Sequence, residues 1–89
     1  MRKISITTQF KRDTKRVKKS GKDVEELKAV IAKLAAGENL EDKYRDHALT
    51  GSYRQTRECH LEPDWLLIYK CTKDELILIR TGSHSELFQ

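Results

Sequence analysis

Residues that interrupt helices and strands or form cross-links are scarce in this sequence, which has one proline, four glycines and two cysteines among 89 residues. No apolar run approaches the roughly 20 residues that a membrane-spanning helix needs. The first residues are a basic pair followed by Ile4 and Ile6 among polar neighbours, which is too short and too polar for the core of a signal peptide. We therefore expect a cytoplasmic protein that does not associate with a membrane.

The two cysteines, Cys59 and Cys71, do not form a CxxC motif. In a reducing compartment they stay thiols, and we interpret both as strand residues. The three histidines have neither the HxH nor the HxxxH spacing that favours zinc. A zinc site built from three histidines and one aspartate is therefore a minor alternative, and we expect no metal and no cofactor.

The balance of apolar and charged residues limits the size of the fold. With 37% hydrophobic and 36% charged residues, the chain can build one sheet packed against one or two helices. A length of 89 residues is near the lower limit for a core that folds independently. We predict a single domain over residues 1–89.

Positive charge is concentrated at the beginning of the chain. Residues 1–22 hold nine Lys or Arg and one acid, whereas residues 46–89 hold five Lys or Arg and seven acids. A basic flank suits a polyanionic partner, because cations gain affinity by releasing counterions from phosphates. The alternative, a solvated helix face that contacts no partner, is equally consistent with this pattern.

Apolar periodicity predicts one strand and two helices in the first 36 residues. Residues 3–8 alternate as in a strand, and Thr7 or Thr8 can cap a helix over residues 9–20 that Gly21 ends. A second helix runs from a capping box at residues 23–26 to residue 36, and Gly37 ends it. The first helix has a narrow apolar stripe of Phe10, Thr14 and Val17 and is otherwise basic.

The second half of the chain predicts three strands. Residues 38–52 read as a loop, and the strands span about residues 53–60, 65–72 and 75–81 with turn-like residues between them. Residues 65–69 are apolar on both faces, which indicates a central strand. We predict an α+β fold: one strand, two helices, then a three-stranded antiparallel meander (βααβββ), with the helices on one side of the sheet.

Strand connectivity brings several polar residues together. His60 ends one strand, Asp64 lies in the following turn, and the last strand exits toward both of them just before His84. Two imidazoles near neutral pH can serve as base and acid, and RNA brings its own nucleophile, the 2′-hydroxyl. Arg80 can clamp a phosphate with its planar fork. Each residue also has an ordinary interpretation: the histidines can be polar surface, Asp64 can be a turn residue, and Arg80 can pair with an acid on a neighbouring strand.

Three ordered segments then add a resemblance. Residues 44–52 (YRDHALTGS), 57–69 (RECHLEPDWLLIY) and 80–88 (RTGSHSELF) resemble the motifs of the YafQ-like toxins of the RelE/ParE superfamily. The resemblance implies a RelE-like fold and a toxin of a type II toxin-antitoxin system. Such a toxin is a ribosome-dependent endoribonuclease that cuts messenger RNA (mRNA) without a metal and is silenced by a cognate antitoxin protein.

The resemblance also implies roles for single residues. The catalytic positions are His47, His60, Asp64 and His84. His84 or His60 would take the 2′-hydroxyl proton, the other or Asp64 would serve the leaving group, and His47 would orient substrate or stabilise charge. The substrate-binding positions are Arg80 for phosphate and Phe88 for stacking on a base. Independently of the resemblance, the positive charge of the first helix suits docking on ribosomal RNA through Lys11, Arg12, Lys15 and Lys18.

Three alternatives remain at this point. Phe88 can instead be a C-terminal core plug. A toxin of the same fold can act on a protein target, as ParE-like toxins act on gyrase, but such a toxin has no need of the three histidines. A non-catalytic RNA-binding module would keep the basic helix and tolerate the loss of any histidine.

Overall fold

Local sequence signals set the first elements of the computed structural model, which describes residues 1–51 and 55–88. Strand β1 (Lys3–Ile6) ends two residues earlier than predicted, because the Thr7 side chain accepts a hydrogen bond from Phe10 N and caps helix α1 (Thr8–Lys19). Helix α2 (Val24–Ala35) begins after Asp23, whose carboxylate accepts from the first-turn amides as expected of an N-cap.

The predicted capping box at α2 is realised only in its first half. The carboxylate of Glu26, expected to reach back to the cap, instead accepts a 2.7 Å hydrogen bond from the hydroxyl of Tyr44. Tyr44 ends the short 3-10 helix η1 (Asp42–Tyr44). This bond ties the segment after α2 to the helix.

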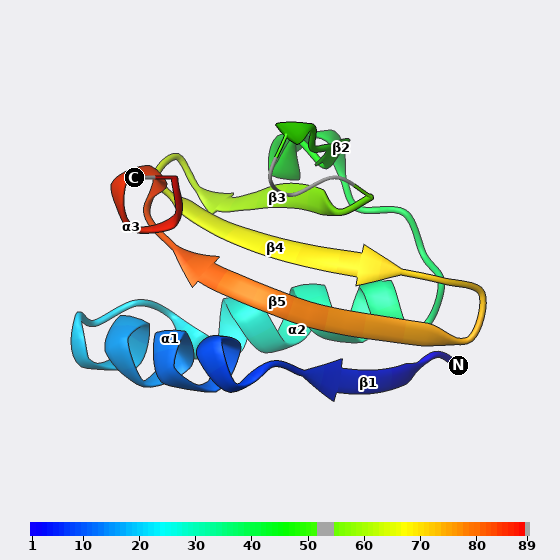
Figure 1. Ribbon diagram of the computed structural model, residues 1–89, viewed down its shortest axis with the longest axis horizontal. Coiled ribbons are helices and arrows are strands. Elements are labelled where there is room, and N and C mark those ends of the chain that lie inside the picture. The colour runs from blue at the N-terminus through cyan, green and yellow to red at the C-terminus, as the bar shows by residue number, and fades with distance from the viewer. Residues whose placement is uncertain (52–54, 89) are drawn as a thin grey trace.

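The sheet has five strands in the order β1-β5-β4-β3-β2 (Figure 1). The predicted antiparallel meander is confirmed in β3 (Arg57–Glu62), β4 (Trp65–Cys71) and β5 (Glu75–Gly82), with β4 in the centre. Two pairings were not predicted: β1 joins β5 in parallel, and the two-residue strand β2 (His47–Ala48) pairs with β3. The sheet is therefore mixed rather than a meander plus one separate strand.

Three boundaries differ from the sequence prediction. Strand β3 starts at residue 57 rather than 53, and residues 52–54 of the predicted loop and strand lie outside the described residues. Strand β3 ends at residue 62 rather than 60, and its pairing with β4 is irregular between His60 and Glu62. The predicted loop 38–52 contains η1 and β2, and a further helix, α3 (His84–Leu87), follows β5.

The two faces of the sheet bury different clusters. On one face α1 and α2 pack against inward residues of β3, β4 and β5, as predicted; this main core includes Phe10, Val17, Leu27, Leu67 and Leu78. On the other face a small cluster of Leu66, Ile68 and Leu87 lies beneath α3. No helix in the described part of the chain is long and apolar enough to cross a membrane.

Helix α1 runs alongside β5 beyond the end of β1 (Figure 1). There side chains of α1 and of its N-cap, Thr7, complete the hydrogen bonding of the strand. Thr7 Oγ1 donates to the carbonyl of Ile79, Asp13 accepts from the amide of Thr81, and Arg16 donates to the carbonyl of Thr81. The second half of the β5 edge is therefore paired with side chains of a helix rather than with a strand.

Candidate active site

The register of the sheet places three polar side chains on the face opposite α2. His47 of β2 is directly paired with Glu58 of β3, and His60 lies two residues further along β3. Residues two apart on a strand point to the same face. Glu58 and His60 are paired with Ile68 and Leu66 of β4, which belong to the small cluster under α3.

Helix α3 adds His84 to this group of polar side chains. Its N-cap is Ser83, which forms a capping box with Glu86, and its buried Leu87 anchors the turn on the sheet. Its first residue, His84, meets Asp64 of the β3–β4 turn: Asp64 Oδ1 accepts from the His84 amide at 2.9 Å and contacts Nδ1 at 2.8 Å. The predicted convergence of His60, Asp64 and His84 is confirmed.

The aromatic rings form a row. The ring centroids of His47 and His60 are 6.1 Å apart, those of His60 and His84 are 5.8 Å apart, and that of Phe88 follows at 6.1 Å from His84. The row draws on β2, β3 and the C-terminal turn, so segments distant in sequence form one surface. A single phosphate with its flanking sugars can contact several of these rings at once.

His47 has an acceptor at each ring nitrogen. Nδ1 lies 2.7 Å from the carbonyl oxygen of Arg45, and Nε2 lies 2.9 Å from a carboxylate oxygen of Glu58. A carbonyl and a carboxylate only accept hydrogen bonds, so the ring satisfies both contacts when both nitrogens are protonated. A cationic His47 next to the buried Glu58, whose side chain is 6% exposed, is suited to stabilising negative charge on a phosphate.

His60 is held more loosely by polar contacts. Its side chain is 12% exposed, and Nε2 is 3.6 Å from Glu58, beyond hydrogen-bond distance. Nδ1 is buried without a hydrogen-bond partner among the described residues. The ring can therefore exchange a proton with a substrate without breaking a strong bond to the protein.

His84 has the opposite arrangement. The carboxylate of Asp64 fixes the proton on Nδ1, which leaves the Nε2 lone pair available as a base. The hydrogen bonds from the His84 amide and ring lower the pKa of the Asp64 carboxyl. Asp64 thus stays ionised near neutral pH and suits orienting His84 better than donating a proton.

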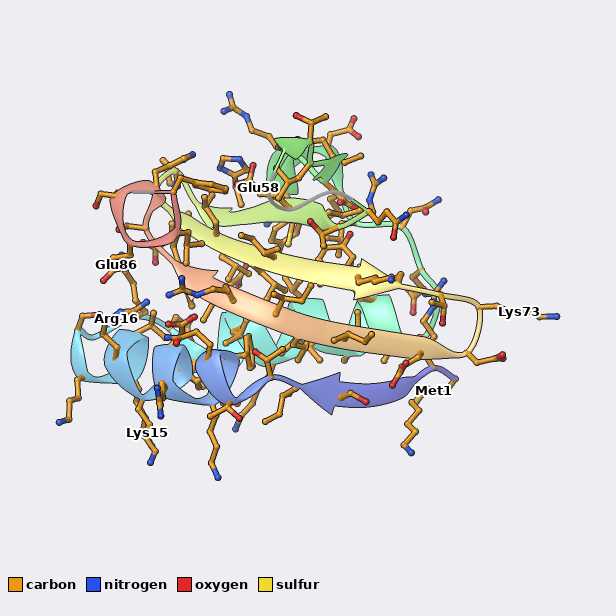
Figure 2. The ribbon with its side chains drawn as sticks, in the orientation of Figure 1. Met1, Lys15, Arg16, Glu58, Lys73 and Glu86 are labelled. Atoms are coloured by element: carbon orange, nitrogen blue, oxygen red, sulfur yellow. The ribbon has the colours of Figure 1, made fainter. Side chains whose placement is uncertain are left out.

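The predicted substrate-binding residues are spread over the molecule. Arg80 donates twice to the buried carboxylate of Asp13. It is thus paired with an acid, but with one on helix α1 rather than on a neighbouring strand. Phe88 is 43% exposed, whereas its neighbour Leu87 is buried, so the core-plug interpretation of Phe88 is wrong. Lys11, Arg12, Lys15 and Lys18 are exposed on α1; Figure 2 shows Lys15 pointing away at the edge of the molecule opposite Glu58.

A hollow of about 330 Å³ lies beside His60. Lys43 and Arg45 line one part of it, and Leu61, Glu62 and Pro63 complete the lining. Two cations next to a histidine provide contacts for a phosphate that flanks the reacting bond. Neither cation was predicted from the sequence, because the loop that carries them has no periodic pattern.

A second chemical use of this surface is metal binding. One ligand atom each from His47, Glu58 and His60 lie within 4.8 Å of one another. Imidazole and carboxylate together suit Zn²⁺ or Cu²⁺, and three protein ligands leave a position open. The spacing test applied to the sequence missed this cluster, because its members come from two paired strands rather than from one helix or turn.

Two further residues had no assigned role in the sequence. Glu58 is one of them, because only the β2–β3 register reveals that it touches His47 and approaches His60. Asp13 was treated as one acid in a basic helix. It lies three residues after Phe10 and four before Val17, and this spacing puts it on the buried face of α1. That position was the signal in the sequence that Asp13 is a buried acid.

Comparisons with known proteins agree with this geometry. A family model described as "Bacterial toxin of type II toxin-antitoxin system, YafQ" matches residues 2–89. The Escherichia coli mRNA interferase toxin YafQ is 41% identical over 88 residues, which cover 98% of this chain and 96% of the relative.

Solved structures give the same result. YafQ in the Escherichia coli DinJ–YafQ complex is 40% identical, with a TM-score of 0.93 over 100% of both chains. A metal-bound toxin from Helicobacter pylori is 44% identical, with a TM-score of 0.93 over 99% of this chain and 100% of that one.

Proposed function

The chain belongs to the YafQ family of bacterial toxins of type II toxin-antitoxin systems, and from this membership we propose that it is an mRNA interferase whose chemistry rests on His47, His60, Asp64 and His84. Its substrate is messenger RNA on the ribosome, so it works in the cytoplasm. The observation that carries the proposal is the row of three histidine rings, with centroids 6.1 and 5.8 Å apart, next to Asp64.

The reaction needs one proton removed and one supplied. Nε2 of His84 takes the proton of the 2′-hydroxyl, the 2′-oxygen forms a bond to phosphorus, and the bond from phosphorus to the 5′-oxygen breaks. His60 supplies the proton to the leaving 5′-oxygen. The products are a 2′,3′-cyclic phosphate and a free 5′-hydroxyl, and the two histidines have exchanged protonation states.

The remaining residues bind and stabilise. His47, held between the Arg45 carbonyl and Glu58, orients the substrate or stabilises the negative charge that develops on the phosphate. Arg80 contacts phosphate from its position over Asp13. Phe88 stacks on an unpaired base, because base stacking on an exposed aromatic ring tolerates many sequences.

The basic face of α1, formed by Lys11, Arg12, Lys15 and Lys18, docks on ribosomal RNA through phosphate contacts. The toxin is held silent by a cognate antitoxin, as its Escherichia coli relative occurs in a complex with DinJ. An acidic or amphipathic antitoxin segment that orders on binding would complement the basic surface.

The deciding experiment is induced expression of the wild type and His84→Ala in bacteria, with primer extension on a reporter message. Growth arrest with new in-frame cuts, both lost in His84→Ala, is the expected result. Arrest without cuts would point to a protein target such as gyrase. Cuts that persist in His84→Ala would rule out the histidine mechanism.

The role of metal needs its own measurement, because the His47, Glu58 and His60 cluster can hold an ion and the Helicobacter pylori relative is a metal-bound toxin. We propose that cleavage does not need that ion. A zinc chelator that spares ribosomal magnesium should leave the cutting rate unchanged, and added Zn²⁺ or Cu²⁺ should inhibit, because the ion occupies the histidine nitrogens. Activity lost in the chelator and restored by zinc would assign a metal enzyme instead.

A further inference from the structure

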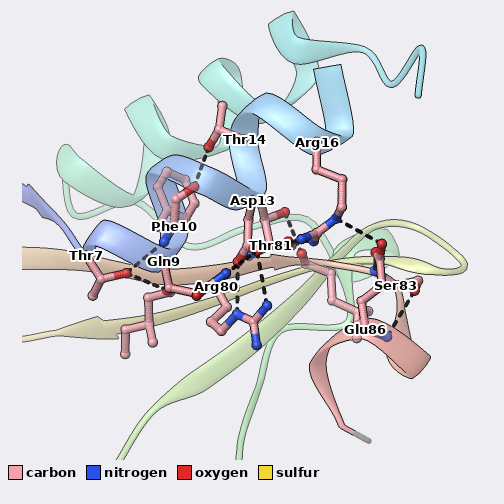
Figure 3. A network of polar contacts seen from close by, with 12 residues as sticks. Thr7, Gln9, Phe10, Asp13, Thr14, Arg16, Arg80, Thr81, Ser83 and Glu86 are labelled. Atoms are coloured by element: carbon pink, nitrogen blue, oxygen red, sulfur yellow. Dashed lines mark hydrogen bonds and ion pairs between the residues drawn. The ribbon is translucent and has the colours of Figure 1, made fainter. Parts of the chain in front are cut away.

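One arginine connects the basic helix to the turn that carries His84. All three guanidinium nitrogens of Arg16 are engaged: Nη1 donates to Asp13 at 2.8 Å, Nη2 donates to the carbonyl of Thr81 at 3.0 Å, and Nε lies 2.9 Å from Glu86 Oε2 (Figure 3). The Nε contact is an ion pair without an aligned hydrogen bond. Arg16 thus touches α1, β5 and α3 together.

The orientation of Arg16 is fixed by a buried charge. The side chain of Asp13 has no exposure to solvent, and it accepts hydrogen bonds from Arg16, Arg80, Gln9 and the Thr81 amide. A buried carboxylate is stable only with such partners. The orientation of the Arg16 guanidinium is therefore determined by the buried Asp13 carboxylate rather than by contacts at the surface.

Glu86 uses its two carboxylate oxygens for different tasks. Oε1 accepts from the amide of Ser83 at 2.8 Å, and the Ser83 hydroxyl accepts from the Glu86 amide, which closes the cap of α3. Oε2 faces Arg16. The residue that shapes the turn before His84 is thus also the residue that Arg16 holds.

The backbone at Gly82 leaves the space for this contact. A Cβ atom at this position would lie 2.6 Å from Nη2 of Arg16 and 2.9 Å from Oε1 of Glu86. Arg16 and Glu86 therefore close over the end of β5 because residue 82 has no side chain.

Helix α3 needs anchors of this kind. It has four residues, and a helix so short does not hold its shape alone. Leu87 fixes one side of it against the sheet. The side chains of His84 and Asp64 are 53% and 66% exposed, so their contact restrains the turn weakly. Those of Arg16 and Glu86 are less exposed, at 38% and 41%, and Arg16 is also held by Asp13 and Thr81.

We propose that Arg16 and Glu86 are positioning residues for cleavage: the Asp13–Arg16–Glu86 chain holds α3 so that His84 faces the bound phosphate beside His60 and Phe88 lies beside His84. The proposal rests on the nuclease function proposed above. Neither residue touches the reacting atoms. Each acts through the placement of His84, and catalysis is sensitive to small displacements of a catalytic group.

Kinetics on programmed ribosomes test the proposal, with Glu86→Gln as the main variant. Glutamine keeps the cap, since it serves in capping boxes as glutamate does, but it loses the charge that faces Arg16. We expect the maximal single-turnover cutting rate to fall about tenfold while the half-saturating toxin concentration changes less than about twofold. Glu41→Gln is the matched control, because it removes an ion pair with Lys33 of α2 rather than one between α1 and α3.

Arg16→Met and the double variant separate positioning from RNA binding. If both residues act through one contact, the double variant should be no slower than the slower single variant. A rise in the half-saturating concentration with an unchanged maximal rate in Arg16→Met would overturn the proposal and make Arg16 an RNA contact. An unchanged rate in Glu86→Gln would also overturn it.

Hydrogen exchange tests the structural part without relying on cleavage. The amides of His84, Leu87 and Phe88 donate to Asp64, Ser83 and His84 respectively. They should exchange about tenfold faster in Glu86→Gln, while the amides of α2 remain unchanged. Unchanged exchange at these amides would overturn the anchor even if the wild type cuts RNA. If the amides exchange faster in Glu86→Gln but the wild type cuts no RNA, the anchor is supported and the nuclease function is refuted.

Discussion

At the scale of single residues, the contrast between Asp13 and Asp64 shows how surroundings decide the use of a carboxylate. Asp13 is fully buried under four donors, so its charge stabilises the fold. Asp64 is exposed and accepts hydrogen bonds from the amide and the ring of His84, so its charge orients that imidazole. The sequence singled out only the second of them, because strand connectivity brings the turn that carries Asp64 close to His60 and His84.

The acid dependence of stability follows from Asp13. Burial alone would raise the pKa of its carboxyl, but hydrogen bonds from Arg80, Gln9, Thr81 and Arg16 outweigh it and lower the pKa to about 2. The folded-state pKa lies below the unfolded value, so this stabilisation is complete above about pH 4 and is lost as pH falls toward 2.

We therefore expect Asp13→Asn to be less stable than the wild type at pH 7, and the gap to shrink by about 2 kcal/mol at pH 2. Urea unfolding at both pH values measures it. A gap that is the same at both pH values would show that the charge of Asp13 does not contribute.

The cysteines give a second prediction at this scale. Burial, and then the negative charges of Asp46 and Glu58, raise the pKa of the Cys59 thiol to about 12. Burial also raises the pKa of the half-buried Cys71. In the folded protein a thiol reagent should therefore label Cys71 slowly and leave Cys59 unlabelled, and both should react in urea. Mass spectrometry of the labelled peptides checks this, and rapid labelling of native Cys59 would contradict the buried placement.

At the scale of elements, long periodic segments were predictable and short ones were not. Helices α1 and α2 and strands β4 and β5 were predicted to within about two residues, because apolar periodicity and caps define them. The two-residue β2 and the four-residue α3 are too short to show a period. They exist because of tertiary contacts, namely pairing with β3 and the burial of Leu87.

The difficulty of predicting short elements also determined which site residues could be predicted from the sequence. His60, Asp64 and His84 follow from strand order alone, since a meander returns its third strand to the first turn. The place of His47 depends on β2, which has no signal of its own in the sequence. Its function was inferred from family resemblance, and the role of Glu58 required the register of both strands.

The junction between β1 and α1 rests on Thr7, which caps the helix and donates to the carbonyl of Ile79. Thr7→Ala removes both hydrogen bonds and should lower the free energy of unfolding by about 1–2 kcal/mol. Thr8→Ala is the control, because Thr8 is exposed and does not cap the helix. Chemical denaturation compares the three proteins, and equal losses in both variants would show that the cap is unimportant.

At the scale of the whole molecule, Lys15 of the basic helix and Glu58, which contacts His47, lie on opposite sides (Figure 2). One RNA segment of a few nucleotides does not need to touch both. The arrangement suits a large polyanion, with one region held by α1 and another presented to the histidines. Affinity and cleavage are therefore expected to respond to different substitutions.

A double variant, Lys15→Ala with Lys18→Ala, tests this separation. It should weaken ribosome binding and reduce the slope of log affinity against log salt by about 2, because each lysine releases about one counterion. The cut positions on the message should stay the same. Lys28→Ala is the control, since Lys28 lies on α2 and pairs with Glu25. Sedimentation with ribosomes over a salt series gives the slope, and a slope equal to that of the wild type would remove α1 from the interface.

Helix α1, which borders β5, also limits the ability of the sheet to add strands from other chains. An unpaired strand edge is a template on which further chains add by backbone hydrogen bonding, and proteins avoid this with short or covered edges. Here the outer strands β1 and β2 have four and two residues, and α1 side chains satisfy the end of β5. The toxin is therefore expected to reach high concentration with little tendency to polymerise through its sheet.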